Sequence, residues 1–102
     1  MKLWIDDIRN APNNDYIWIK SVNEFIKWFN EHQNCNISII DLDHDSGDYC
    51  KDGGDYIRIL DFLEFKKMQD KELHFKIHSM NPVGRHNMEN IILKHKNWTL
   101  ER

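Results

Sequence analysis

Four side chains capable of chemistry lie close together in the middle of the chain: Asp41, Asp43, His44 and Asp45. They end an apolar run at residues 36–42 that is rich in β-branched residues. Such residues suit the pleated, covered surface of a sheet, so the run predicts a buried strand. Carboxylates bind hard cations, and an imidazole titrates near neutral pH. The sequence therefore predicts a site at the carboxyl end of this strand.

Polar groups follow two other short apolar segments. Asp6 and Asp7 come directly after the first segment of the chain, and His78, Ser79 and Asn81 follow a later one. In open α/β sheets, ligands bind outside the carboxyl ends of the strands. Taken alone, the Asp6–Asp7 pair is equally consistent with a solvated turn.

Strand and helix patterns alternate along the chain. Strand patterns occupy residues 2–5, 16–20, 36–42 and 73–77, and helical patterns occupy residues 22–32, 55–70 and 82–95. Residues 98–100 are either a short last strand or a tail. Ser21 followed by Glu24 has the spacing of a capping box, which predicts a helix start. The alternation predicts right-handed crossovers and a mostly parallel sheet.

The first predicted helix has one apolar face. Phe25, Ile26, Trp28 and Phe29 recur at helical spacing. Such a stripe is typical of a helix that packs on a hydrophobic core. We therefore expect this helix to be a packing element.

These elements predict an α/β fold with a flavodoxin-like, three-layer sandwich arrangement. The small sheet would have the strand order 2-1-3-4, with a fifth strand if residues 98–100 pair. The segment after Arg9, N-A-P-N-N-D, is dense in turn-forming residues, so a loop is expected in place of the usual first helix. The length of 102 residues predicts a single domain, residues 1–102.

The strand order decides whether the polar groups meet. Strands 1, 3 and 4 of the flavodoxin-like order are neighbours about 4.8 Å apart, so their ends would share one pocket. Clustered acids repel one another unless a cation lies among them. Asp6, Asp7 and Asp43 are therefore candidate ligands of Mg²⁺ or Mn²⁺. We expect Asp41 to be an outward-facing strand residue.

His44 and His78 are the candidate acid and base of this pocket, because imidazole exchanges protons near neutral pH. Asp43 and Asp45 would complete the catalytic group by orienting the histidines or by holding a metal. A chance grouping of these residues is the weaker explanation.

Four further residues are candidate substrate ligands: Arg9, Ser79, Asn81 and Arg85. Each can donate hydrogen bonds to phosphate oxygens, and residues 82–85 open a helix, whose free amides favour an anion. The two arginines could instead form surface ion pairs of little energetic weight.

The composition excludes several protein classes. The net charge of −3 argues against a general nucleic-acid binder, which carries a basic face. The chain has neither an apolar run near the roughly 20 residues of a membrane helix nor a signal-peptide pattern, so we expect a cytoplasmic protein without membrane contact. Cys35 and Cys50 lack metal-type spacing and are expected to be free thiols. A homo-oligomer stays open.

Three longer motifs occur along the chain: W-I-D-D-I-R-N-A-P, L-D-H-D-S-G and H-S-M-N-P-V-G-R-H-N-M. In this order and spacing they resemble the cyclic-phosphate processing receiver domain family over nearly the whole chain. The resemblance implies a receiver-like α/β domain that processes cyclic phosphate or cyclic nucleotide groups. Two positions depart from it: Gly54-Asp55-Tyr56 stands where the family tends to show G-Y-D, and Lys20 replaces an arginine.

Two functions follow. The first is a phosphoesterase that hydrolyses or opens a cyclic phosphate or cyclic (di)nucleotide signal. It would suit signalling control, or a viral counter to nucleotide-based immunity in the host cytoplasm. The alternative is a non-catalytic receiver-like domain that sequesters such a ligand or accepts a phosphoryl group on Asp43. The lysine that phosphoacceptor receivers carry after the fifth strand is missing from residues 98–102, which counts against phosphoryl acceptance.

Overall fold

The computed structural model describes residues 1–101 and confirms a receiver-like α/β fold. The strands are β1 (Lys2–Ile5), β2 (Tyr16–Ile19), β3 (Ile39–Leu42), β4 (Leu73–Ile77) and β5 (Trp98–Glu101), and the α-helices are α1 (Val22–Glu31), α2 (Ile57–Phe65) and α3 (Pro82–Leu93). Two 3₁₀ helices, η1 (Gly47–Lys51) and η2 (Met68–Asp70), lie in the connections. Within residues 1–101, no helix has the length and apolar character needed to cross a membrane.

The sheet has the strand order β2-β1-β3-β4-β5, and every neighbouring pair is parallel. This confirms the expected order, and it shows that the last segment pairs as a fifth strand. Ile5 is level with Leu42, and Leu42 is level with Ile77. The residues that follow β1, β3 and β4 therefore leave the sheet side by side.

The core lies between the sheet and the helices. Leu3, Ile40 and Phe75 contribute one face of the sheet, Phe25 and Met88 come from α1 and α3, and all five are fully buried. Because side chains alternate along a strand, the residues between these core positions lie on the opposite face.

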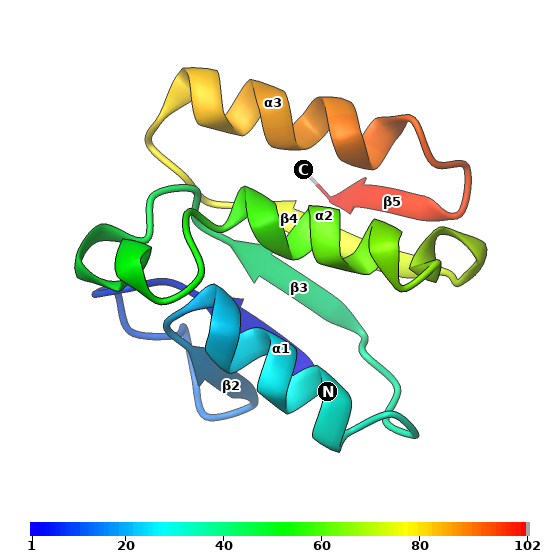
Figure 1. Ribbon diagram of the computed structural model, residues 1–102, viewed down its shortest axis with the longest axis horizontal. Coiled ribbons are helices and arrows are strands. Elements are labelled where there is room, and N and C mark those ends of the chain that lie inside the picture. Colours follow the sequence, from blue (N-terminus) through cyan, green and yellow to red (C-terminus); the bar gives the residue numbers. More distant parts are fainter. Residues whose placement is uncertain (102) are drawn as a thin grey trace.

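The three described helices lie on the same face of the sheet, which corrects the expected three-layer sandwich (Figure 1). The crossovers through α1, α2 and α3 all move in one direction along the sheet, and right-handed crossovers in one direction share a face. The connection from β1 to β2 moves the other way, and it is the predicted loop and not a helix. Among residues 1–101, no helix covers the second face.

The start of α1 confirms the N-cap expected at Ser21. The Ser21 hydroxyl accepts a hydrogen bond from the backbone N–H of Glu24 at 3.0 Å. The Glu24 carboxylate accepts one from the backbone N–H of Lys20, one residue before the cap. Phe25 is buried as expected, whereas Trp28 is only half-buried and stacks on the His32 ring.

Two expected element boundaries were too long. The helix expected at residues 55–70 ends at Phe65, because Lys67 takes a left-handed conformation (φ 59°) before η2 begins. The strand expected at residues 36–42 pairs only from Ile39. The loop expected at residues 43–54 contains η1.

Candidate functional site

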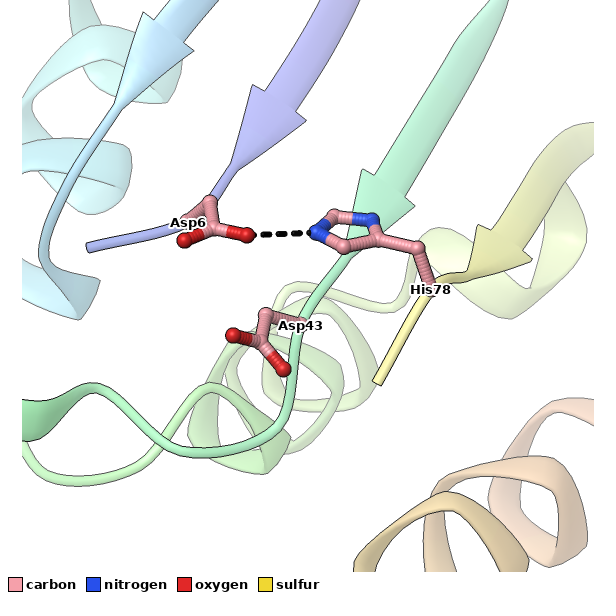
Figure 2. A group of neighbouring side chains, drawn as sticks. All are labelled: Asp6, Asp43 and His78. Atoms are coloured by element: carbon pink, nitrogen blue, oxygen red, sulfur yellow. Dashed lines mark hydrogen bonds and ion pairs between the residues drawn. The ribbon is translucent and has the colours of Figure 1, made fainter. Parts of the chain in front are cut away.

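His78 lies between two carboxylates at the end of β4. Its Nδ1 is 2.6 Å from Oδ1 of Asp41, and its Nε2 is 2.8 Å from Oδ2 of Asp6. Figure 2 shows the contact to Asp6. Burial alone would lower the pKa of His78, but the bonds to Asp41 and Asp6 outweigh it and raise the pKa above its usual value. An imidazolium that donates from both nitrogens fits this geometry.

The surroundings of His78 fix its ring and tie two loops together. The Trp4 ring stacks on it with a centroid separation of 3.9 Å and an interplanar angle of 1°. An aromatic face stabilises a cation lying over it. The Trp4 indole N–H donates to the Arg9 carbonyl, and the Arg9 guanidinium donates to the His78 carbonyl at 3.1 Å. The predicted phosphate ligand Arg9 is thus used here to hold the backbone.

Asp6 is fully buried and its two oxygens are engaged. Oδ1 accepts hydrogen bonds from the backbone N–H groups of Ile8 and Arg9 at 3.0 and 2.9 Å, and Oδ2 accepts from His78. Burial would raise the pKa of Asp6, but the two backbone donors and His78 lower it overall. Asp6 is therefore held as a carboxylate.

The pKa of Asp7 is shifted in the opposite direction to that of Asp6. Its pKa is raised by burial and by the neighbouring carboxylates of Asp6 and Asp43. Gly47 packs against it in a left-handed conformation (φ 55°), and a Cβ at that position would collide with the Asp7 carboxylate. Burial is the larger cause, and repulsion from the two neighbouring carboxylates adds to it.

The acid cluster of Asp6, Asp7 and Asp43 fits a hard divalent cation by its chemistry. One ligand atom each of Asp6, Asp43 and His78 lies within 4.8 Å of the others (Figure 2). Since the His78 nitrogens face carboxylates, the usable donors are oxygens, which Mg²⁺ and Mn²⁺ prefer. The repulsion on Asp7 is what such a cation would relieve.

His44 has one engaged and one available ring nitrogen. Nδ1 lies 2.8 Å from Oδ1 of Asp45, whereas Nε2 has no hydrogen-bond partner within residues 1–101. The bond from His44, followed by a weaker contribution from Asn81, lowers the pKa of Asp45 despite some burial. A carboxylate at Nδ1 favours the tautomer that leaves Nε2 as a proton acceptor.

The start of α3 positions His44. A Cβ on Gly84 would lie within 2.6 Å of ring atoms of His44, so only glycine lets this ring pack against the helix. Asn81 caps α3 by accepting from the Gly84 N–H at 3.0 Å, and its amide donates to Asp45 at 3.3 Å. The predicted substrate ligand Asn81 thus links the helix cap to the Asp45–His44 pair.

The two other predicted substrate ligands also have partners inside the protein. Ser79 is buried, and its hydroxyl accepts from the Asn81 N–H at 3.1 Å. The Arg85 guanidinium donates to Glu89 one turn further along α3 at 3.4 Å. A role in phosphate binding for either stays a prediction.

The sequence led us to expect His44 and His78 in one cluster. The structure places them in two separate groups. His44 lies against Gly84 on the helix side of the sheet edge. His78 lies against Trp4 and Asp41, whose strand positions alternate with core residues and so belong to the uncovered face. The chain segment from Asp43 to Asp45 joins the two groups.

Sequence reasoning missed two residues of these groups. Asp41, expected to point outward, is 4% exposed and binds His78. Asp55 has an oxygen close to ligand atoms of His44 and Asp45, and it accepts from Ser46. Side chains alternate between the two faces along a strand, and this alternation could have shown that Asp41 lies on the same face as Trp4. Asp55 lies in a loop, where no such alternation exists.

A cavity of about 340 Å³ lies away from these groups. It is at the amino edge of the sheet, lined by Phe29, His32 and Ile37 on one side and by Met68 and Leu73 on the other. The titratable clusters lie at the carboxyl edge. We place the candidate site there because the charge arrangement, and not the depth of a hollow, indicates chemistry.

Comparison with known proteins gives one match. The model of the family described as cyclic-phosphate processing receiver domain matches residues 1–94. Searches of curated proteins and of solved structures find no match. The match covers β1 to α3, and so it includes the acid cluster with His78 and the His44–Asp45 pair.

Proposed function

Because the chain belongs to the cyclic-phosphate processing receiver domain family, we propose that it is a phosphodiesterase that hydrolyses a cyclic phosphate ester. The family supports a role related to cyclic-phosphate processing. The observation that favours catalysis is the His44 ring, which is oriented by Asp45 at Nδ1 and available at Nε2. This is the arrangement that a general base needs.

In the proposed reaction, Nε2 of His44 takes a proton from water, and the water oxygen attacks phosphorus. One phosphorus–oxygen bond of the ring breaks, and the leaving oxygen takes a proton from solvent. The products are a phosphate monoester and a free hydroxyl on the same molecule. Asp45 stabilises the imidazolium that forms on His44.

His78 has a different role in this proposal. Both of its nitrogens face Asp41 and Asp6, so no N–H is directed at a ligand. It holds Asp6 and the Arg9 loop in place, and it is a positioning residue. The leaving-group acid expected from the sequence is therefore not assigned to His78.

Asp6, Asp7 and Asp43 would hold Mg²⁺ or Mn²⁺. Such an ion supplies positive charge for the phosphoryl oxygens. Asp6 is fixed by its backbone donors, and Oδ1 of Asp43 accepts a hydrogen bond from the His44 backbone N–H at 2.8 Å, which leaves Oδ2 of Asp43 for such an ion.

The biological consequence of the proposed reaction would be the removal of a cyclic nucleotide signal in the cytoplasm. Both signalling control and a viral counter to nucleotide-based immunity would use that outcome. The chemistry is the same in both settings.

The test is turnover of a panel of cyclic mono- and dinucleotides, followed by chromatography, with Mg²⁺ or Mn²⁺ and with EDTA. We expect wild-type protein to form the linear monoester. His44→Ala should lower kcat by about 10²–10⁴-fold, the usual contribution of a general base. His86→Ala is the matched control, because His86 is exposed on α3 and is expected to keep full activity.

Intact nucleotide recovered from wild-type protein across the panel would refute the proposal. Tight binding without turnover would instead support the sequestering domain. In that case His44→Ala would change the affinity alone.

A further inference from the structure

The cavity at the amino edge of the sheet lies between two segments, residues 29–37 and residues 68–73, and has a volume of about 340 Å³. Cavities that bind small molecules begin at about this size. At about 30 Å³ for each water-sized group, it has room for a ligand of about eleven non-hydrogen atoms. It is too small to enclose a nucleotide, so its ligand differs from that of the carboxyl edge.

Hydrogen bonds hold both walls of the cavity in place. On one side, Nδ1 of His32 lies 2.7 Å from the Trp28 carbonyl oxygen, and the two rings stack. On the other side, the Trp98 indole N–H donates to the Met68 carbonyl at 3.0 Å, and Leu73 belongs to β4. A cavity that is formed before its ligand arrives costs little conformational entropy to fill.

The cavity offers apolar surface on both sides. Phe29 and Leu73 belong to the buried core, and Ile37 and Met68 are half-buried against it. A ligand that covers these side chains gains the free energy of removing apolar surface from water. The part of the ligand that enters the cavity is therefore apolar.

Charge at the mouth of the cavity selects the polar end of the ligand. Lys71 lines the cavity, is exposed, and its ammonium forms no ion pair within residues 1–101. Glu72 lines the cavity too, but its Oε1 lies 3.4 Å from Nε2 of His74. The charge left without a partner at the mouth is positive, and it is complementary to a carboxylate.

We propose that this cavity is a second ligand site, which binds a small apolar molecule that ends in a carboxylate. The apolar body lies between Phe29 and Leu73, and the carboxylate pairs with the Lys71 ammonium. The site is separate from the acid cluster, and it does not depend on the proposed hydrolysis.

Two thiols of the protein provide the test. Cys35 lines the cavity, whereas Cys50 lies in η1, and both are exposed. The probe is 3-phenylpropionate, and labelling of each thiol by N-ethylmaleimide is followed by mass spectrometry. A ligand of this size binds with a Kd of about 1 mM. At about ten times that concentration, we expect the labelling of Cys35 to slow about tenfold and that of Cys50 to be unchanged.

The role of charge is tested by one substitution and one analogue. Lys71→Gln should raise the concentration needed for half-maximal protection by about threefold, the effect of losing one exposed ion pair. Lys96→Gln is the matched control, because it removes the same charge from an exposed position before β5 that does not line the cavity. The amine 3-phenylpropylamine, which has the same apolar body and the opposite charge, should protect Cys35 less than the carboxylate.

Several results would overturn the second site. Unchanged labelling of Cys35, or equal slowing at Cys35 and Cys50, would show that the probe does not fill the cavity. Equal protection by the amine and the carboxylate, or an equal effect of Lys71→Gln and Lys96→Gln, would reject the pairing with Lys71. The turnover of cyclic nucleotides is measured separately, so its failure would reject the phosphodiesterase alone.

Discussion

At the scale of single residues, His44 and His78 have the same side chain, but their neighbours give the two rings different chemistry. One carboxylate at Nδ1 orients the His44 ring and leaves Nε2 available. Two carboxylates and a stacked indole enclose His78 and favour its charged form. A base needs a free nitrogen, so the bonding pattern separates the roles of the two residues.

The charge on His78 predicts a pH dependence of stability. Its pKa is raised in the folded protein, so its contribution is complete below the usual value of about 6.5 and is lost as pH rises through the folded pKa. We expect Tm in EDTA to fall as pH rises above about 6.5 and through the raised folded pKa of His78, and the fall to be smaller in His78→Gln.

His74 serves as the control for this titration. Its pKa is also raised, first by the bond to Glu101, but it lies on the exposed sheet surface. His74→Gln should keep most of the fall in Tm. A fall of full size in His78→Gln would show that His78 is not the group responsible.

At the scale of elements, α3 positions His44, the candidate base, because Gly84 has no side chain and leaves room for the His44 ring. Gly84→Ala would place a methyl group where the His44 ring lies. Helix propensity favours alanine by about 0.5–1 kcal/mol, so the fold should persist while the ring moves. We expect kcat to fall by about 10²-fold, the cost of a displacement of about 1 Å, with Tm little changed.

The same measurements on Asn87→Ala provide the comparison, because Asn87 is exposed on α3. Activity should be unaffected there. Full activity in Gly84→Ala would mean that the position of the His44 ring does not matter.

Within α1, we expect Phe25 to contribute more to the free energy of unfolding than Trp28. Phe25 is fully buried and touches the rings of Phe29 and Phe62. Phe25→Ala should lower the free energy of unfolding by about 3–5 kcal/mol, as emptying a large core position does. Trp28→Ala should cost clearly less, since that ring is half-buried. Urea denaturation of both variants checks the order, and equal losses would contradict it.

At the scale of the whole molecule, the alternating pattern was enough to predict the parallel sheet. The strand order came from the flavodoxin-like arrangement, and the loop after Arg9 from its density of turn-forming residues. The single covered face was derivable from the handedness of crossovers, since the missing helix belongs to the one crossover that runs the other way.

The sequence predicted the sheet edge at which the site residues lie more readily than the side chains that each of them contacts. Parallel pairing places Asp6, Asp43 and His78 at one edge, because Ile5, Leu42 and Ile77 are level. Which face each side chain takes depends on the last turn of backbone after each strand, and no periodicity extends into those loops. For this reason the strand pattern predicted one group for His44 and His78, whereas the structure keeps them in separate groups.

The acid cluster predicts that the whole protein is stabilised by a divalent cation. The chain carries a net charge of −3, and several of its carboxylates gather at one edge, where burial and then repulsion from Asp6 and Asp43 raise the pKa of Asp7. A ligand that binds only the folded state adds about 2.7 kcal/mol at a hundredfold excess over its Kd. We expect Mn²⁺ or Mg²⁺ to raise Tm, and EDTA to reverse the rise. Asp43→Asn should remove most of the effect.

Asp48→Asn is the matched control, because it removes the same charge from an exposed position in η1 outside the cluster. The cation should stabilise this variant as it does wild type, since net charge alone does not create a site for a hard ion. An equal rise in Tm for Asp43→Asn and wild type would show that the cation binds elsewhere. A wild-type Tm that does not respond to either cation would mean that His78, already placed between Asp6 and Asp41, supplies the positive charge the cluster needs.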